Sequence, residues 1–122
     1  MTRTLLVTDD APIIREMIKD AVTEAGWSVA GEAGDGREAV EWYKALRPDA
    51  VTLDLVMPEY DGLFALREIM AHDPAAKVLV VSALDQKRVL REAFKAGARD
   101  FLIKPFDRRL LLESLEHFVP GA

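Results

Sequence analysis

Hydrophobic residues along this chain follow two alternating patterns. Short continuous apolar runs, rich in β-branched residues, are typical of strands that are buried on both faces of a sheet. Longer segments place apolar residues three and four positions apart, as amphipathic helices do. The continuous runs predict five strands, at Thr4–Thr8, Trp27–Ala33, Ala50–Asp54, Lys77–Ser82 and Phe101–Ile103.

An amphipathic helix is predicted after each strand. Asp107 can cap the last helix, and Gly97 suits the position just past the fourth. The apolar residues of each helix lie on one face, which we expect to turn toward the core; they include Ile13, Met17, Leu46 and Phe94. The helices are expected at Ala11–Ala25, Arg37–Leu46, Leu63–His72 and Gln86–Ala96, and after Asp107.

Strict alternation of strand and helix predicts an α/β fold with a parallel sheet and helices on both faces. Right-handed crossover connections leave few topologies for such a chain. The second strand is the least apolar, so we place it near a sheet edge. This favours the flavodoxin-like, doubly wound, five-stranded sheet with strand order 2-1-3-4-5 and five helices.

The segment Val51–Gly62 carries the most chemical information. Its apolar run ends at Asp54, and Pro58, which cannot donate a hydrogen bond to a sheet ladder, stops the strand soon afterwards. Asp54 is therefore expected at the carboxyl end of a buried strand, the edge where open α/β sheets bind ligands. A carboxylate with apolar neighbours on both sides is costly to bury unless another group pairs with it.

Polar residues end the other strands as well. Asp9 and Asp10 follow the first strand, Ser82 ends the fourth and Lys104 follows the fifth. The carboxyl ends of parallel strands share one edge, so these groups should meet Asp54 there. Three carboxylates (−3) and one ammonium (+1) sum to −2. Like carboxylates raise one another's pKa, and a hard divalent cation such as Mg²⁺ would remove the conflict.

With Mg²⁺ bound, this edge would hold one candidate nucleophile, because an aspartate can attack phosphorus and form an aspartyl phosphate. We assign Asp54 as the phosphoacceptor. Lys104 and the metal would neutralise charge on the transferring phosphoryl oxygens, and Ser82 could donate a hydrogen bond to the product.

The metal ligands are assigned in the same way. Asp10 is expected to bind the metal directly, Asp9 through water or as a weaker ligand, and the backbone carbonyl of Val56 to complete the set with Asp54. Asp10 can also cap the first helix ahead of Pro12, so it is expected to cap and ligate at once.

These motifs together resemble the receiver domains of two-component response regulators, in particular stand-alone CheY-like chemotaxis regulators. The resemblance covers essentially the whole chain. It rests on Asp9-Asp10, on Asp54 within LDLVMPEYDG, on Ser82-Ala83 and on Lys104-Pro105-Phe106. It implies that a histidine kinase supplies the phosphoryl group, that Mg²⁺ is required and that the Lys104–Pro105 peptide bond is cis. It also implies a phosphoacceptor signalling domain rather than an enzyme.

The resemblance further implies a switch. In the family, the hydroxyl at the position of Ser82 moves toward the phosphoryl group, and an aromatic residue, here Phe101, turns inward. Many relatives carry tyrosine where this chain has Phe101, which can fill the same space but has no hydroxyl to form a hydrogen bond at the surface, so we do not expect an output that depends on that bond. The family's usual output surface runs from the fourth helix through the fifth, and the implied partner is a downstream protein such as the flagellar motor switch.

Phosphoryl lifetime is the last property that the resemblance addresses. In the family, the residues two positions after the acceptor and two after the switch hydroxyl influence hydrolysis. Here these residues are Val56 and Leu84, and neither apolar side chain can orient an attacking water. We therefore expect slow autodephosphorylation.

Composition narrows the remaining possibilities. The 122 residues suit one domain, residues 1–122, which we expect to stand alone. The net charge of −5 without a dominant basic cluster argues against direct nucleic-acid binding. No apolar run approaches the ~20 residues that span a bilayer, and the absence of cysteine excludes thiolate chemistry. We expect a cytoplasmic protein.

Three alternatives remain at this stage. A flavodoxin-like FMN-binding protein would need a phosphate-binding loop after the first strand, where this chain has Asp9-Asp10. An aspartyl-phosphate hydrolase would usually carry Asp-x-Asp there, and a lid. A receiver that feeds a phosphorelay or a non-motility effector differs from a chemotaxis regulator only in its partners.

Overall fold

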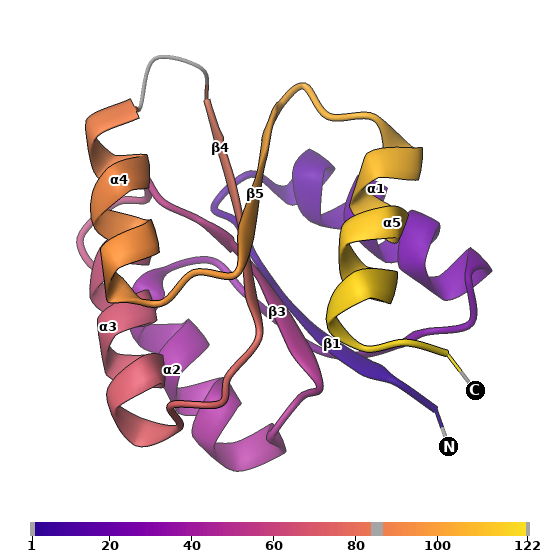
Figure 1. Ribbon diagram of the computed structural model, residues 1–122, viewed down its shortest axis with the longest axis horizontal. Helices are drawn as coiled ribbons and strands as arrows, with labels where there is room; N and C mark the ends of the chain where they lie inside the picture. The colour runs from indigo at the N-terminus through magenta and orange to yellow at the C-terminus, as the bar shows by residue number, and fades with distance from the viewer. Residues whose placement is uncertain (1, 84–86, 122) are drawn as a thin grey trace.

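The computed structural model describes residues 2–83 and 87–121 of the chain. Within them, five parallel strands form one sheet in the order β2-β1-β3-β4-β5, which confirms the predicted topology (Figure 1). The edge position of β2 is confirmed too. The strands are β1 Thr4–Thr8, β2 Ser28–Ala33, β3 Ala50–Asp54, β4 Val78–Ala83 and β5 Asp100–Lys104.

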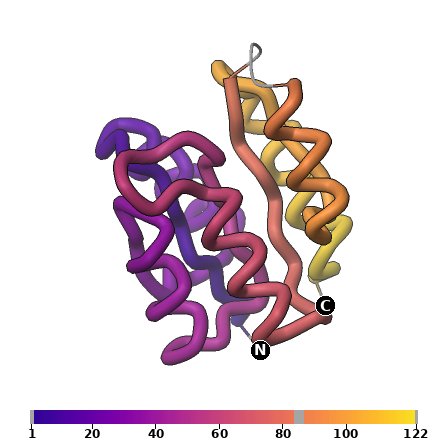
Figure 2. The backbone as a smooth tube through the Cα atoms, turned by 90° about the vertical axis from the view of Figure 1, so that its left-hand side faces the viewer, coloured from indigo at the N-terminus to yellow at the C-terminus, as the bar shows by residue number. Residues whose placement is uncertain are grey.

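Helices cover both faces of this sheet. On one face α2, α3 and α4 lie side by side, and α1 and α5 lie on the other (Figures 1 and 2). Gln86, the expected start of the fourth helix, lies outside the described residues. The helices are α1 Pro12–Glu24, α2 Gly36–Leu46, α3 Gly62–His72, α4 Lys87–Ala96 and α5 Arg108–Phe118. None of these helices is long and apolar enough to cross a membrane.

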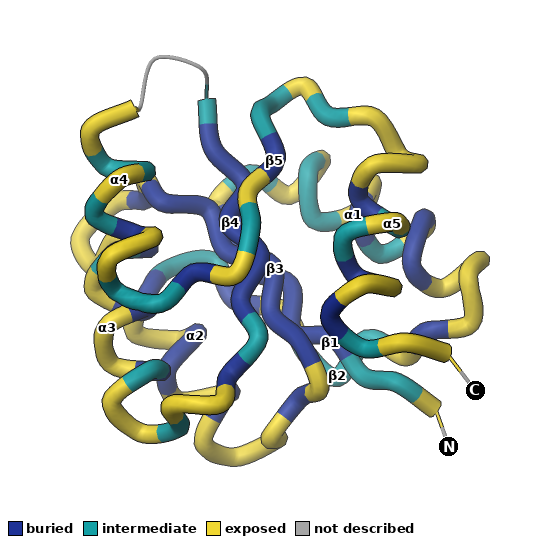
Figure 3. Tube along the Cα trace, in the orientation of Figure 1, coloured by how far each residue is buried: buried dark blue, intermediate teal, exposed yellow. Residues whose placement is uncertain are grey.

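The sheet separates two hydrophobic cores. Successive strand residues point to opposite faces, so Leu6 packs under α2 and α3 while Leu5 and Val7 pack under α1 and α5. Both faces of the central strands are therefore buried, as the dark strands in Figure 3 show. This arrangement explains why the strands appear in the sequence as continuous apolar runs.

Four apolar helix residues do not face the core as expected. Ile13 is 67% exposed and Met17 46%, although both belong to the apolar face of α1. Both lie at one side of the apolar sector, whereas Ile14, Ile18 and Val22 on its other side pack into the core beneath α1. Leu46 and Phe94 are also partly exposed. The apolar sector of a helix can be wider than the stripe that its neighbours cover.

Candidate functional site

Three carboxylates meet at the carboxyl edge of the sheet. Asp9, Asp10 and Asp54 each place one carboxylate oxygen within 4.8 Å of the others, so their expected grouping is confirmed. They come together because β1 and β3 are paired neighbours. Asp9 is 1% exposed and Asp54 5%, whereas Asp10 is exposed to solvent.

Lys104 reaches this cluster from the far edge of the sheet. Its Nζ lies 2.7 Å from Oδ2 of Asp9 and 3.3 Å from Oδ2 of Asp54. Burial would lower the pKa of Lys104, but its contacts with both carboxylates outweigh burial and raise that pKa. The ammonium therefore stays charged. The peptide bond between Lys104 and Pro105 is cis, as expected.

The surroundings of Asp54 disfavour the ionised form of its carboxyl group. Burial first, and then the charge of Asp9, raise the pKa of Asp54 from 3.8 to about 6, despite the opposing effects of Lys104 and of the Val56 N–H. That N–H donates to Oδ1 of Asp54 at 3.2 Å. One ammonium does not offset the charge of three carboxylates. An oxygen-rich cluster with excess negative charge fits a hard divalent cation such as Mg²⁺.

Asp9 is already engaged at both carboxylate oxygens. Its Oδ2 contacts Lys104, and its Oδ1 accepts a hydrogen bond from the N–H of Ala11 at 2.9 Å. Ala11 is the N-cap residue of α1, and within residues 2–83 and 87–121 no side chain caps this helix. The expectation that Asp10 caps α1 is therefore wrong. Pro12 occupies the first helical position, so Asp10 lies one residue too early to act as the cap.

A close backbone contact fixes the loop that follows Asp54. The N–H of Gly62 donates to the carbonyl of Leu55 at 3.0 Å, and a Cβ at Gly62 would lie 1.9 Å from the carbonyl oxygen of Asp54. The first turn of α3 therefore lies directly against the end of β3. Asp61 caps α3 by accepting a hydrogen bond from the N–H of Phe64, the capping role considered for it in the sequence.

The two expected switch residues lie in very different surroundings. Ser82, at the end of β4, is fully buried, and among the described residues no hydrogen-bond partner reaches its Oγ. Phe101 of β5 is 38% exposed and packs edge-on against Phe94 of α4, with ring centroids 5.7 Å apart. In this structure Phe101 therefore lies at the surface. Leu84, which we expect to influence hydrolysis, lies outside the described residues.

One residue at this edge was not predicted. Arg15 of α1 donates a hydrogen bond from Nη1 to the backbone carbonyl of Asp9 at 2.6 Å. The sequence offers no signal for this contact, because an arginine on an amphipathic helix is ordinarily a solvated residue.

Comparison with known proteins is consistent with this geometry. The sequence profile of the response regulator receiver domain family matches residues 5–116. The chain is 52% identical over 115 residues to the chemotaxis protein CheY of Thermotoga maritima, covering 94% of this chain and 96% of that protein. It is 50% identical over 112 residues to CheY of Listeria monocytogenes, covering 92% and 94%.

Solved structures show the same relationship. The CheX–CheY–BeF3–Mg²⁺ complex from Borrelia burgdorferi contains a chain that superimposes with a TM-score of 0.91 at 32% identity, over 98% of this chain and 90% of that one. The response regulator domain of Thermotoga maritima CheB gives 0.83 at 35% identity, over 97% and 94%. This chain therefore belongs to the family of response regulator receiver domains, the phosphorylation switches of two-component systems.

Proposed function

We propose that Asp54 accepts the phosphoryl group and that the transfer requires Mg²⁺ held by Asp9, Asp10, Asp54 and the backbone carbonyl of Val56. One observation carries this proposal: three carboxylates lie within 4.8 Å of one another, and a charged lysine lies beside two of them. Membership of the receiver family favours this proposal over the FMN-binding and hydrolase alternatives.

The ligand roles follow from the contacts that each carboxylate already makes. Asp10 is exposed and free to bind the cation directly. Asp9, held at one oxygen by Lys104 and at the other by the Ala11 N–H, contributes through water or as a weaker ligand. Bound Mg²⁺ would neutralise charge on phosphoryl oxygens.

The transfer itself is a displacement at phosphorus. A carboxylate oxygen of Asp54 attacks the phosphorus of a phosphohistidine on the kinase. A P–O bond forms while the P–N bond breaks, and the electron pair leaves on the imidazole nitrogen, which takes up a proton. Lys104 lies close enough to Asp54 to stabilise negative charge on the transferring group. The domain assists this transfer and its own dephosphorylation, and turns over no other substrate.

Phosphorylation then acts through Ser82 and Phe101. The phosphoryl group adds about −1.5 to −2 charges at Asp54, which can shift a conformational equilibrium only through contacts that differ between the two states. The buried, unpartnered Oγ of Ser82 supports such a contact, because a hydrogen bond to a phosphoryl oxygen would satisfy it. Movement of Ser82 would leave room for Phe101 to turn inward from its exposed position.

The output is altered binding of a downstream protein to the face formed by α4, β5 and α5. The exposed Phe94–Phe101 pair and the exposed cations Lys87, Arg88 and Arg91 of α4 support this choice. Similarity to chemotaxis proteins over most of the chain favours the flagellar motor switch as that partner. A relay protein or a non-motility effector is the alternative. A cytoplasmic location stays a prediction.

Treatment with acetyl phosphate or beryllofluoride plus Mg²⁺ tests the proposal. Wild type is expected to gain the mass of one phosphoryl group with acetyl phosphate, and to show amide NMR shifts around Ser82 and Phe101 with either reagent. Asp54→Asn should show neither. Modification that persists in Asp54→Asn would overturn the assignment. Pull-down with a flagellar switch peptide then separates chemotaxis from the relay alternative, because only the former predicts tighter binding after phosphorylation.

A further inference from the structure

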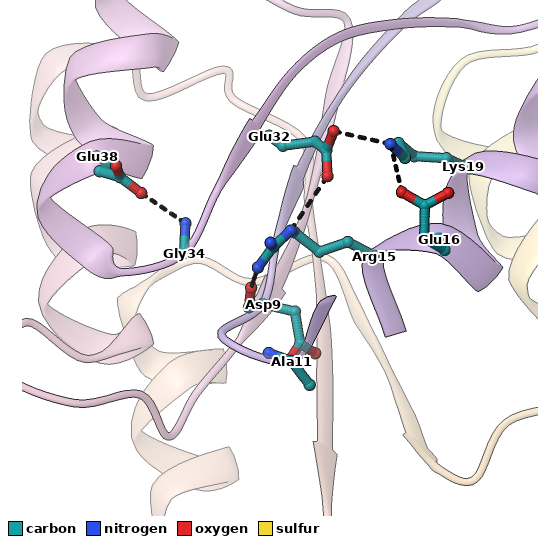
Figure 4. A network of polar contacts seen from close by, with 8 residues as sticks. All are labelled: Asp9, Ala11, Arg15, Glu16, Lys19, Glu32, Gly34 and Glu38. Atoms are coloured by element: carbon teal, nitrogen blue, oxygen red, sulfur yellow. Dashed lines mark hydrogen bonds and ion pairs between the residues drawn. The ribbon is translucent and has the colours of Figure 1, made fainter. Parts of the chain in front are cut away.

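Arg15 links the backbone at Asp9 to the edge strand of the sheet. Its guanidinium donates through Nη1 to the carbonyl of Asp9 at 2.6 Å and through Nε to Oε1 of Glu32 on β2 at 3.1 Å (Figure 4). The Arg15 side chain is only 21% exposed. From its position on α1, Arg15 therefore connects the residue that follows β1 to the neighbouring strand β2.

Glu32 is itself held in place. Lys19, one turn further along α1, places its Nζ 2.8 Å from Oε2 of Glu32 and 2.7 Å from Oε1 of Glu16. The hydrogen bond from Lys19, and after it that from Arg15, lower the pKa of Glu32 against the opposing effect of burial. The carboxylate that orients the Arg15 guanidinium thus stays ionised near neutral pH.

The contact with Asp9 constrains the residue that follows. The carbonyl of Asp9 and the N–H of Asp10 belong to one planar peptide group, so a bond to the carbonyl restricts the backbone from which the Asp10 side chain leaves. The α1 helix begins without a side-chain cap, which leaves few contacts to hold this loop. Among the described residues, Asp9 is also held by the hydrogen bond from its N–H to the Ala33 carbonyl at 3.1 Å, by that from the Ala11 N–H to its Oδ1, and by the ion pair with Lys104.

We propose that Arg15 is a positioning residue for the metal site. By holding the Asp9–Asp10 peptide, it orients the acidic pair before the cation arrives and so strengthens Mg²⁺ binding without contacting the metal. Groups that orient metal ligands typically change metal affinity by about 10- to 100-fold when they are removed. The inference rests on the proposed function, because it concerns the same Mg²⁺ site.

The chain supplies a matched control. Lys19 and Arg15 both lie on α1 and both pair with Glu32, but of the two only Arg15 bonds the carbonyl of Asp9. If Arg15 served only to attach α1 to β2, Arg15→Ala and Lys19→Ala should have the same effect. If it positions the acidic pair, only Arg15→Ala should weaken the metal site.

In the experiment, Mg²⁺ is titrated into the wild type, Arg15→Ala and Lys19→Ala without a phosphate donor, and its binding is monitored by amide NMR. We expect Arg15→Ala to raise the dissociation constant about 10-fold and Lys19→Ala to leave it unchanged. Arg15→Lys has a single ammonium, which can reach the Asp9 carbonyl or Glu32 but cannot bond both as the guanidinium does. It should give an intermediate dissociation constant. It also provides the test if Arg15→Ala does not fold.

A kinetic measurement adds a second readout. With acetyl phosphate, Arg15→Ala should need a higher Mg²⁺ concentration for half-maximal phosphorylation, while its rate at saturating Mg²⁺ equals that of wild type. An unchanged dissociation constant in both Arg15 variants, or equal weakening in Lys19→Ala, would overturn the inference and leave the proposed function intact. Failure of wild type to bind Mg²⁺ would instead overturn the metal site itself.

Discussion

The ammonium of Lys104 lies 2.7 Å from a carboxylate oxygen of Asp9, although two strands separate β5 from β1 in the sheet. This ion pair spans the carboxyl edge and draws the acidic cluster together. The same ammonium lies farther from Asp54, at 3.3 Å. Its positive charge therefore offsets less of the cost of burying the Asp54 carboxylate. Lys104 thus stabilises Asp9 at close range, while the pKa of Asp54 stays raised.

The raised pKa of Asp54 predicts a pH-dependent stability. The folded protein keeps a proton on Asp54 up to about pH 6, whereas the unfolded chain loses it near pH 4, so stability falls as the pH rises between these values. In the absence of metal, Asp54→Asn should raise the free energy of unfolding by about 2 to 3 kcal/mol at pH 7.5, at roughly 1.4 kcal/mol per pKa unit. At pH 4 the same substitution should raise the free energy of unfolding only slightly. Urea unfolding at both pH values measures this, and an equal gain at both would contradict it.

The buried hydroxyl of Ser82 predicts a variant that separates modification from response. Ser82→Ala removes an unpartnered buried group, so the unmodified fold should lose little stability. It also removes the contact through which the phosphoryl charge would act. We expect phosphorylation of Asp54 at close to the wild-type rate, measured by mass, with loss of the phosphorylation-dependent gain in partner binding. Equal loss of both would count against the switch role.

The position of Val56 beside Asp54 leads to a prediction about the lifetime of the phosphorylated state. Its side chain is 49% exposed, and its N–H contacts Asp54, so a polar group there could hold a water near the acceptor. Val56→Asn should speed loss of the phosphoryl group several-fold, and Val56→Leu should leave it slow. The decay of phosphorylated protein after removal of the donor measures both.

The sequence makes the same prediction for Leu84→Glu. Unchanged decay in both Val56→Asn and Leu84→Glu would refute the explanation of the slow hydrolysis that we expect.

The contact between Gly62 and the backbone of Asp54 predicts strong intolerance of a side chain. Gly62→Ala would place a Cβ 1.9 Å from the Asp54 carbonyl oxygen, and backbone would have to move. We expect a loss of more than ~3 kcal/mol of unfolding free energy. Gly34→Ala is the control, because its Cβ would lie 3.5 Å from the flexible Glu38 side chain. Similar urea midpoints for the two variants would show that α3 does not need this close approach.

Much of this fold could be predicted because its signals are local. Continuous apolar runs marked the strands, and three- and four-residue spacing marked the helices. Parallel strands present their carboxyl ends at one edge, so the positions of Asp9, Asp54 and Lys104 along the chain were enough to predict that they meet.

Other features were decided only by the tertiary structure. The preference of Lys104 for Asp9, the contact of Arg15 with the Asp9 carbonyl and the approach of Gly62 to β3 were not foreseen. Each depends on how far one element is rotated or shifted against another. Periodicity identifies the apolar face of a helix, but the packing of neighbouring elements determines which atoms come within hydrogen-bonding distance.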